Sequence, residues 1–152
     1  MLHFAYGSNM SRAVMRRHAP DAQPVGIAML SNYRFMITID GYASIAPRPA
    51  QAVYGVVWRL TPRDRVGLDV WENIAGRQYR AEMLRVRVEN RLLPILIYVA
   101  RRSGIGVPKA GYMEVVVAAA RAWELPPDYI ASLQRWLPTR PSAAGTRKFG
   151  DF

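Results

Sequence analysis

Strand-like segments follow one another along this chain too closely for regular βαβ crossovers, and this spacing is what most limits the possible folds. Apolar, β-branched or alternating residues mark six segments, which are 2–6, 25–30, 33–39, 53–60, 83–89 and 92–100. A βαβ crossover needs a dozen or more residues, usually including a helix. We therefore expect an α+β layout of about six strands and four short helices.

Helical segments are predicted at 11–18, 61–72, 110–124 and 128–137. Ser11 is a good N-cap residue for the first of them, and Thr61 followed by Pro62 is typical of the start of the second. The breaks that follow the helices contain proline or glycine. The apolar residues of the second helix are expected to face the core; they are Val66, Leu68 and Val70.

The length and the composition fit a single domain with a short tail. The chain has 152 residues, of which 51% are hydrophobic, and composition does not shift before the last dozen residues. We expect a domain over 1–137 and a C-terminal tail over 138–152. Because cysteine is absent and only two histidines occur, thiolate catalysis, disulfides and the usual zinc sites are excluded, and we expect no metal and no cofactor.

The net charge of +10 could point to a nucleic acid, but its distribution does not. All but two of the 21 cationic residues are arginines, and they are scattered without a run of five or more. Such a spread is typical of a solvated basic surface. No basic stretch precedes a long apolar run, and no uncharged segment of 18 residues occurs. We expect a cytoplasmic protein, monomeric or homodimeric, with no specific nucleic-acid partner and no membrane partner.

The residues from Tyr6 to Met10 are the first candidate site. They follow an apolar strand and precede a helix, and the sequence between them is Gly-Ser-Asn. Gly7 allows backbone conformations closed to other residues, and a loop entering a helix presents N–H groups that can bind an anion such as a carboxylate. The alternative is an ordinary turn, since Ser and Asn are common turn and cap residues.

Glu72 is the second candidate, because its place at a helix end beside Trp71 is unusual for a carboxylate. The helix dipole disfavours a negative charge there. Among aromatic side chains a carboxyl group would be partly desolvated, its pKa would rise, and it could act as a general base near neutral pH. The alternative is a solvated Glu at the end of a helix.

Tyrosines at the ends of elements and one histidine complete the candidates. The tyrosines are Tyr79, Tyr98, Tyr112 and Tyr129, which could line a pocket with polar hydroxyls or simply close the core. His3 lies on an apolar strand, where a core histidine with satisfied hydrogen bonds is the more ordinary reading than a catalyst.

Taken together, these motifs resemble the γ-glutamylcyclotransferase-like (AIG2-like) family. The matching segments are Phe4-Ala5-Tyr6-Gly7-Ser8-Asn9-Met10, Ala43-Ser44-Ile45-Ala46-Pro47, Val53-Tyr54-Gly55-Val56-Val57-Trp58, Leu68-Asp69-x-x-Glu72 with Tyr79, and Pro108 to Tyr112 with Ala119, Leu125-Pro126 and Tyr129. They occur in the family's order over residues 2 to about 133. The sequence departs from the family at Asn73, which replaces the usual Gly; Asn tolerates a left-handed backbone, so we expect the turn to survive.

The resemblance implies a small, mostly antiparallel β-barrel with peripheral helices and a cavity at one end. It also implies a γ-glutamyl cyclotransferase, an acyltransferase or lyase type of enzyme that forms 5-oxoproline and releases an amine or amino acid, as in glutathione or γ-glutamyl metabolism. Glu72 would be the catalytic general base and acid. The implied substrate-binding residues are Tyr6, Gly7, Ser8 and Asn9, with Met10 shaping the loop, Tyr79 as a pocket wall, and Tyr98 and Tyr112 with hydroxyls facing the cavity.

Two other classes of function are alternatives to this enzyme. One is a noncatalytic module of the same fold that binds a small metabolite or a partner. The other is a basic nucleic-acid-binding domain, whose affinity would depend steeply on salt. An intact Glu72 beside the Tyr6–Asn9 loop favours the enzyme, since a scaffold needs no desolvated carboxylate.

Overall fold

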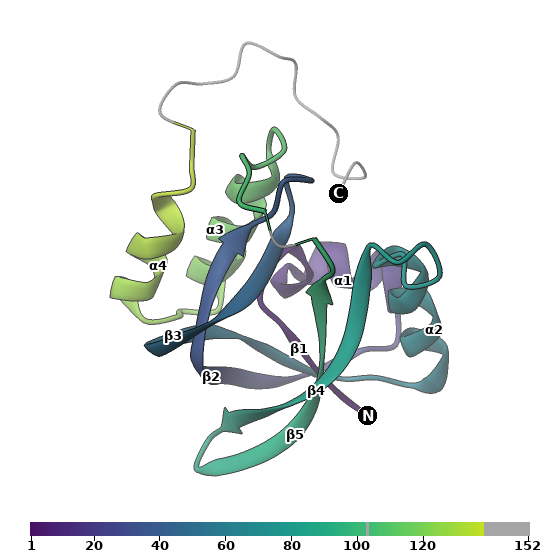
Figure 1. Cartoon of the computed structure of the whole chain (residues 1–152). Helices are drawn as coiled ribbons and strands as arrows, with labels where there is room; N and C mark the ends of the chain where they lie inside the picture. Colours follow the sequence, from purple (N-terminus) through teal and green to yellow (C-terminus); the bar gives the residue numbers. More distant parts are fainter. Residues whose placement is uncertain (103, 139–152) are drawn as a thin grey trace.

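The computed structural model, which describes residues 1–102 and 104–138, contains a closed five-stranded barrel with helices packed outside it (Figure 1). The strand order around the barrel is β1-β3-β2-β4-β5. The strands are β1 (Leu2–Ala5), β2 (Gln23–Ile37), β3 (Ala43–Arg59), β4 (Tyr79–Val88) and β5 (Arg91–Ala100). All neighbours are antiparallel except β1 and β5, which are parallel where His3 pairs with Leu96. The expected α+β barrel is confirmed.

The number of strands is five rather than six in the described part of the chain, because the segments expected at 25–30 and 33–39 belong to one long strand. β2 continues through Asn32, whose positive φ of 64° accompanies a register shift between Ser31 and Tyr33. A β-bulge bends a strand without ending it. The segment expected at 53–60 likewise starts earlier, at Ala43, so that β2 and β3 form a long hairpin.

The helices lie close to where the sequence predicts them. They are α1 (Arg12–His18), α2 (Pro62–Trp71), α3 (Tyr112–Ala122) and α4 (Pro127–Gln134), with a short 3-10 turn, η1 (Ser8–Met10), before α1. The side chain of Ser11 accepts the N–H of Val14, as an N-cap should. Thr61 and Asp64 form a capping box at the start of α2. In Figure 1, α3 and α4 cover one side of the barrel, while α1 and α2 lie on another.

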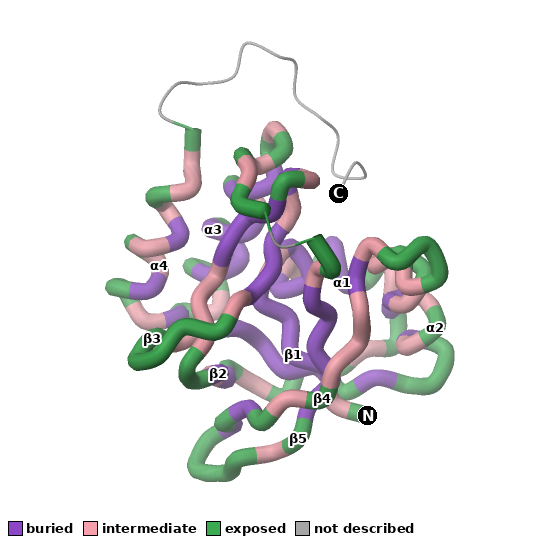
Figure 2. Tube along the Cα trace, in the orientation of Figure 1, coloured by how far each residue is buried: buried purple, intermediate pink, exposed green. Residues whose placement is uncertain are grey.

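The inward face of α2 differs from the expectation. Leu68 is fully buried, whereas Val66 and Val70 are 63% and 76% exposed. Successive positions i and i+2 lie on different faces of a helix, so these three residues cannot all point inward. The core instead lies within the barrel and beneath α3, whereas residues 47–51 of β3 and the tip of the β4–β5 hairpin are exposed (Figure 2).

Close packing between α1 and α2 sets the position of the end of α2. Gly67 approaches the carbonyl oxygen of His18 so closely that a Cβ there would overlap it. One turn later, the rings of His18 and Trp71 stack with centroids 3.9 Å apart. These contacts place the residue after Trp71 beside the loop between β1 and α1. The tail expected at 138–152 lies outside the described residues, except for Pro138.

Candidate active site

The loop from Tyr6 to Met10 is held by contacts on both sides. The Tyr6 hydroxyl donates to the carbonyl of Tyr98 on β5 at 2.5 Å, and the indole N–H of Trp123 donates to the carbonyl of Met10 at 2.8 Å. A Cβ on Gly7 would lie 2.6 Å from the hydroxyl oxygen of Tyr112. A side chain at this point of the loop would therefore require the Tyr112 hydroxyl to move.

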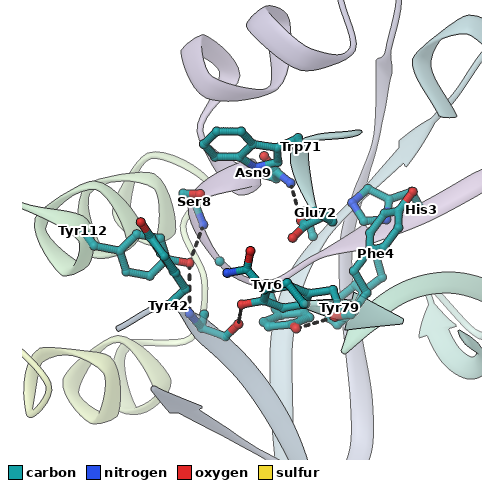
Figure 3. Close-up of a pocket in the computed structure, with 15 residues that line it drawn as sticks. His3, Phe4, Tyr6, Ser8, Asn9, Tyr42, Trp71, Glu72, Tyr79 and Tyr112 are labelled. Atoms are coloured by element: carbon teal, nitrogen blue, oxygen red, sulfur yellow. Dashed lines mark hydrogen bonds between the residues drawn. The ribbon is translucent and has the colours of Figure 1, made fainter. Parts of the chain in front are cut away.

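This loop forms one wall of a cavity of about 220 Å³ at the end of the barrel (Figure 3). Seven of the eight binding residues expected from the sequence, and Glu72, lie around it. The full lining is His3, Phe4, Ala5, Tyr6, Gly7, Ser8, Asn9, Tyr42, Ala43, Trp71, Glu72, Gln78, Tyr79, Tyr98 and Tyr112. Residues far apart in the sequence thus meet around a single hollow.

Glu72 is the acidic residue of this cavity. α2 ends at Trp71, and the backbone N–H of Glu72, at the C-cap position, donates to the carbonyl of Leu68 at 2.8 Å. The side-chain amide of Asn9 donates to Glu72 Oε1 at 3.2 Å. Burial raises the pKa of Glu72 to about 8, while the hydrogen bond from Asn9 opposes the rise. A carboxyl group tuned in this way can exchange a proton near neutral pH.

The turn after Glu72 survives the replacement of glycine by Asn73, as expected. Asn73 adopts a left-handed backbone with φ of 51°. Its side-chain oxygen accepts the N–H of Gly76 at 3.1 Å, which closes the turn locally.

Tyr112 and Tyr79 fix the backbone of Ala43 on the opposite wall. The Tyr112 hydroxyl oxygen accepts the N–H of Ser8 at 3.4 Å and the N–H of Ala43 at 3.3 Å. The Tyr79 hydroxyl donates to the Ala43 carbonyl at 2.7 Å. Burial raises the pKa of Tyr112 to about 12 and raises that of Tyr79 further. Both phenols are therefore neutral hydrogen-bonding groups.

Two expected site residues differ in their role from the expectation. Tyr98 lines the cavity, but its hydroxyl donates to Asp69 on α2 at 2.6 Å, and Asp69 in turn pairs with Arg65 at 2.9 Å. Asp69 does not line the cavity, so this hydroxyl serves the contact between β5 and α2. Met10 is fully buried in the core and does not line the cavity. Its side chain belongs to the hydrophobic core.

Some lining residues were not among the expected site residues. Tyr42 precedes β3 and packs edge-on against Tyr112, with ring centroids 5.5 Å apart. Gln78 precedes β4, and His3 lies on β1. No motif in the sequence marks Tyr42 or Gln78, because their position depends on how the barrel closes. Tyr129, by contrast, is outside the lining and packs against Tyr54.

Within residues 1–102 and 104–138, no group of three or more His, Asp and Glu side chains is placed to hold a metal ion. None of the helices in that part of the chain is long and apolar enough to cross a membrane.

Comparison with known proteins agrees with the fold. The sequence model of the AIG2-like family matches residues 52–133, which is more than half of the chain. The chain therefore belongs to the AIG2-like family.

Its relatives include the γ-glutamylcyclotransferases of Mus musculus and Homo sapiens, which are 26% and 24% identical to it over 144 residues. Each alignment covers 88% of this chain and 77% of the relative. A solved γ-glutamyl cyclotransferase superposes with a TM-score of 0.88 at 21% identity, covering 97% of this chain and 94% of that one. An uncharacterized protein from Homo sapiens gives a TM-score of 0.84 at 22% identity, covering 96% and 91%. These structures share the fold of this chain.

Proposed function

We propose that this protein is a γ-glutamylcyclotransferase with Glu72 as its general base and acid. The observation that carries the proposal is the carboxyl group of Glu72, which is hydrogen-bonded to Asn9 in the wall of a cavity lined by tyrosines, where burial raises its pKa. The names of the mouse and human relatives support the same reaction class. The cavity of about 220 Å³ suits a small substrate arm rather than a macromolecule.

The reaction is an intramolecular acyl transfer. The α-amine of the γ-glutamyl group attacks its own γ-carbonyl carbon, so that a new N–C bond closes the five-membered ring of 5-oxoproline. The bond between the γ-carbonyl and the leaving nitrogen then breaks. Because nucleophile and electrophile belong to one molecule, the site has to fold the substrate arm and hold it. No water is consumed and no covalent enzyme intermediate forms.

Glu72 moves the proton in both halves of this reaction. Its carboxylate takes a proton from the attacking amine and delivers it to the leaving nitrogen, which departs as a neutral amine. The Ser8 N–H donates to Tyr112, so the backbone N–H groups of Gly7 and Asn9 would serve the α-carboxylate and the oxyanion that develops on the γ-carbonyl oxygen. Tyr112 and Tyr79 keep the loop and the backbone of Ala43 at fixed separation.

The test uses the wild type, Glu72→Gln and a matched control, Glu114→Gln, whose carboxylate lies exposed on α3. Each is incubated with a panel of γ-glutamyl amino acids and γ-glutamyl amines, and 5-oxoproline is followed by mass spectrometry. We expect release by the wild type and by Glu114→Gln, and none by Glu72→Gln. Release at the wild-type rate by Glu72→Gln would remove Glu72 from catalysis, and no release by any of the three would favour a noncatalytic binding module.

A further inference from the structure

His3 combines deep burial with an unused acceptor atom. It lies on β1, is 2% exposed, and lines the same cavity as Glu72. Its Nδ1 is 3.2 Å from the carbonyl oxygen of Leu96. A carbonyl oxygen can only accept, so Nδ1 carries the proton. Burial lowers the pKa of His3 to about 4, which keeps the ring neutral. Nε2 therefore presents a lone pair.

That lone pair has no partner in the protein. Among residues 1–102 and 104–138, four buried side-chain polar atoms lack a hydrogen bond, and two of them belong to cavity-lining residues. These two are His3 Nε2 and Asn9 Oδ1. Asn9 is 6% exposed and uses its Nδ2 to donate to Glu72, so its free atom is also an acceptor. Buried acceptors without donors are costly and rare, which calls for a ligand that supplies donors.

The three polar groups at this side of the cavity share one property. His3 Nε2, Asn9 Oδ1 and an ionised Glu72 all accept hydrogen bonds. Figure 3 shows the imidazole of His3 and the amide of Asn9 on either side of the carboxyl group of Glu72. A carboxylate or a phosphate would find no donor among these three atoms, whereas an ammonium group carries three donors and a positive charge.

We propose that His3 Nε2 and Asn9 Oδ1 accept hydrogen bonds from the α-ammonium group of the substrate, with Glu72 as the third acceptor. This inference rests on the proposed function and adds a binding residue, His3, to it. Before the attack the ammonium group releases one proton to solvent, which leaves an amine with one lone pair for the γ-carbonyl carbon and two N–H bonds that the acceptors orient. As the N–C bond forms, Glu72 takes the second proton and delivers it to the leaving nitrogen.

Two substitutions of His3 separate its two hydrogen bonds. In His3→Asn, the side-chain amide can still donate to Leu96 from a position like that of Nδ1, but nothing replaces Nε2. In His3→Gln, the longer side chain can place its oxygen where Nε2 was. Both are made in the Glu72→Gln background, so that substrate binds without turnover, and thermal melts establish that each variant is folded.

Binding is measured by calorimetry with γ-glutamyl-alanine and with N-glutaryl-alanine, which lacks only the α-amine. We expect the Glu72→Gln protein to prefer γ-glutamyl-alanine. Adding His3→Asn should lower the affinity for γ-glutamyl-alanine by about tenfold or more, as expected for the loss of a hydrogen bond to a charged group. The affinity for N-glutaryl-alanine should stay unchanged. Adding His3→Gln should restore most of the affinity. Equal loss for both ligands, no loss, or no binding of γ-glutamyl-alanine would each overturn the proposal.

A spectroscopic measurement needs no substitution at His3. The chain has two histidines, His3 and His18, so ¹⁵N-histidine labelling gives a simple spectrum. Addition of γ-glutamyl-alanine to the Glu72→Gln protein should shift the Nε2 resonance of His3 in the direction of hydrogen-bond acceptance, and N-glutaryl-alanine should not; an unchanged Nε2 resonance would overturn the proposal. Failure of the proposed reaction can be told apart from failure of this inference. In that case the wild type would form no 5-oxoproline, while the amine-dependent shift of the His3 resonance would still be seen.

Discussion

Gly67 on α2 lies against the carbonyl oxygen of His18 at the end of α1, with no room for a side chain between them. This contact brings the C-terminal end of α2, and Glu72 with it, to the loop that carries Asn9. The position of the acidic group thus depends on a residue five positions away that never touches the cavity.

We expect Gly67→Ala to lower catalytic efficiency because the methyl group pushes α2 away from α1. Backbone cannot move aside as the end of a flexible side chain can, so a loss of about 1–3 kcal/mol of stability should accompany it. Gly104→Ala is the matched control, since its added Cβ would find its nearest neighbour at 3.6 Å. Thermal melts and 5-oxoproline release measure both; wild-type behaviour of Gly67→Ala would contradict this account.

Gly7 and Tyr112 provide a second steric test. Gly7→Ala should be destabilising because its Cβ would meet the Tyr112 hydroxyl oxygen at 2.6 Å. In a Tyr112→Phe background that oxygen is absent, so the same change should cost less. A double-mutant cycle of unfolding free energies measures the difference. Strictly additive effects would show that the contact with the hydroxyl is not what excludes a side chain.

Tyr112→Phe by itself should fold but use substrate poorly. It removes the acceptor for the N–H groups of Ser8 and Ala43, at a cost of about 1–3 kcal/mol for buried donors left unpaired. The loop that would hold the substrate then loses its link to β3. Steady-state kinetics beside thermal melts check this, and Tyr98→Phe serves for comparison because that hydroxyl bonds to Asp69 instead. An unchanged kcat/KM in Tyr112→Phe would remove Tyr112 from the site.

The raised pKa of Glu72 predicts a pH dependence of stability. The folded protein holds this proton up to about pH 8, whereas the unfolded chain releases it near 4.5. The contribution of Glu72 is therefore most favourable below pH 4.5 and is lost as the pH rises through 8, by at most about 1.4 kcal/mol per pH unit. Glu72→Gln should gain stability over the wild type across this range. Denaturant unfolding of both proteins at pH 5, 7 and 9 tests it, and a constant difference would contradict it.

Substitutions at buried and at exposed positions of α2 should differ in their effect on the free energy of unfolding. Leu68→Ala should cost about 2–5 kcal/mol, because the residue is fully buried. Val66→Lys and Val70→Lys should change stability by less than about 0.5 kcal/mol, because both side chains are exposed. Denaturant unfolding of the three variants measures this. A large loss in either lysine variant would place the inward face of α2 elsewhere.

The sequence by itself determined the local elements whose signals are short-range. The cap residues Ser11 and Thr61 mark the starts of α1 and α2, and the composition of 92–100 marks β5. The motif around Tyr6 and Glu72 pointed to residues that do meet in one cavity. Such features depend on neighbours within a few positions, so they can be read along the chain.

Tertiary structure alone decided which atoms of the candidate residues are available in the cavity. The bulge near Asn32 joined two expected strands, because pairing with β3 continues past it. The hydroxyl of Tyr98 donates a hydrogen bond to Asp69 instead of facing the cavity. His3, expected as a core residue, lies in the cavity wall with an unpaired Nε2. These contacts form because closure of the barrel brings together residues that are distant in the sequence. A hydrogen bond between two such residues produces no periodic pattern in the sequence around either of them, so it cannot be predicted from the sequence.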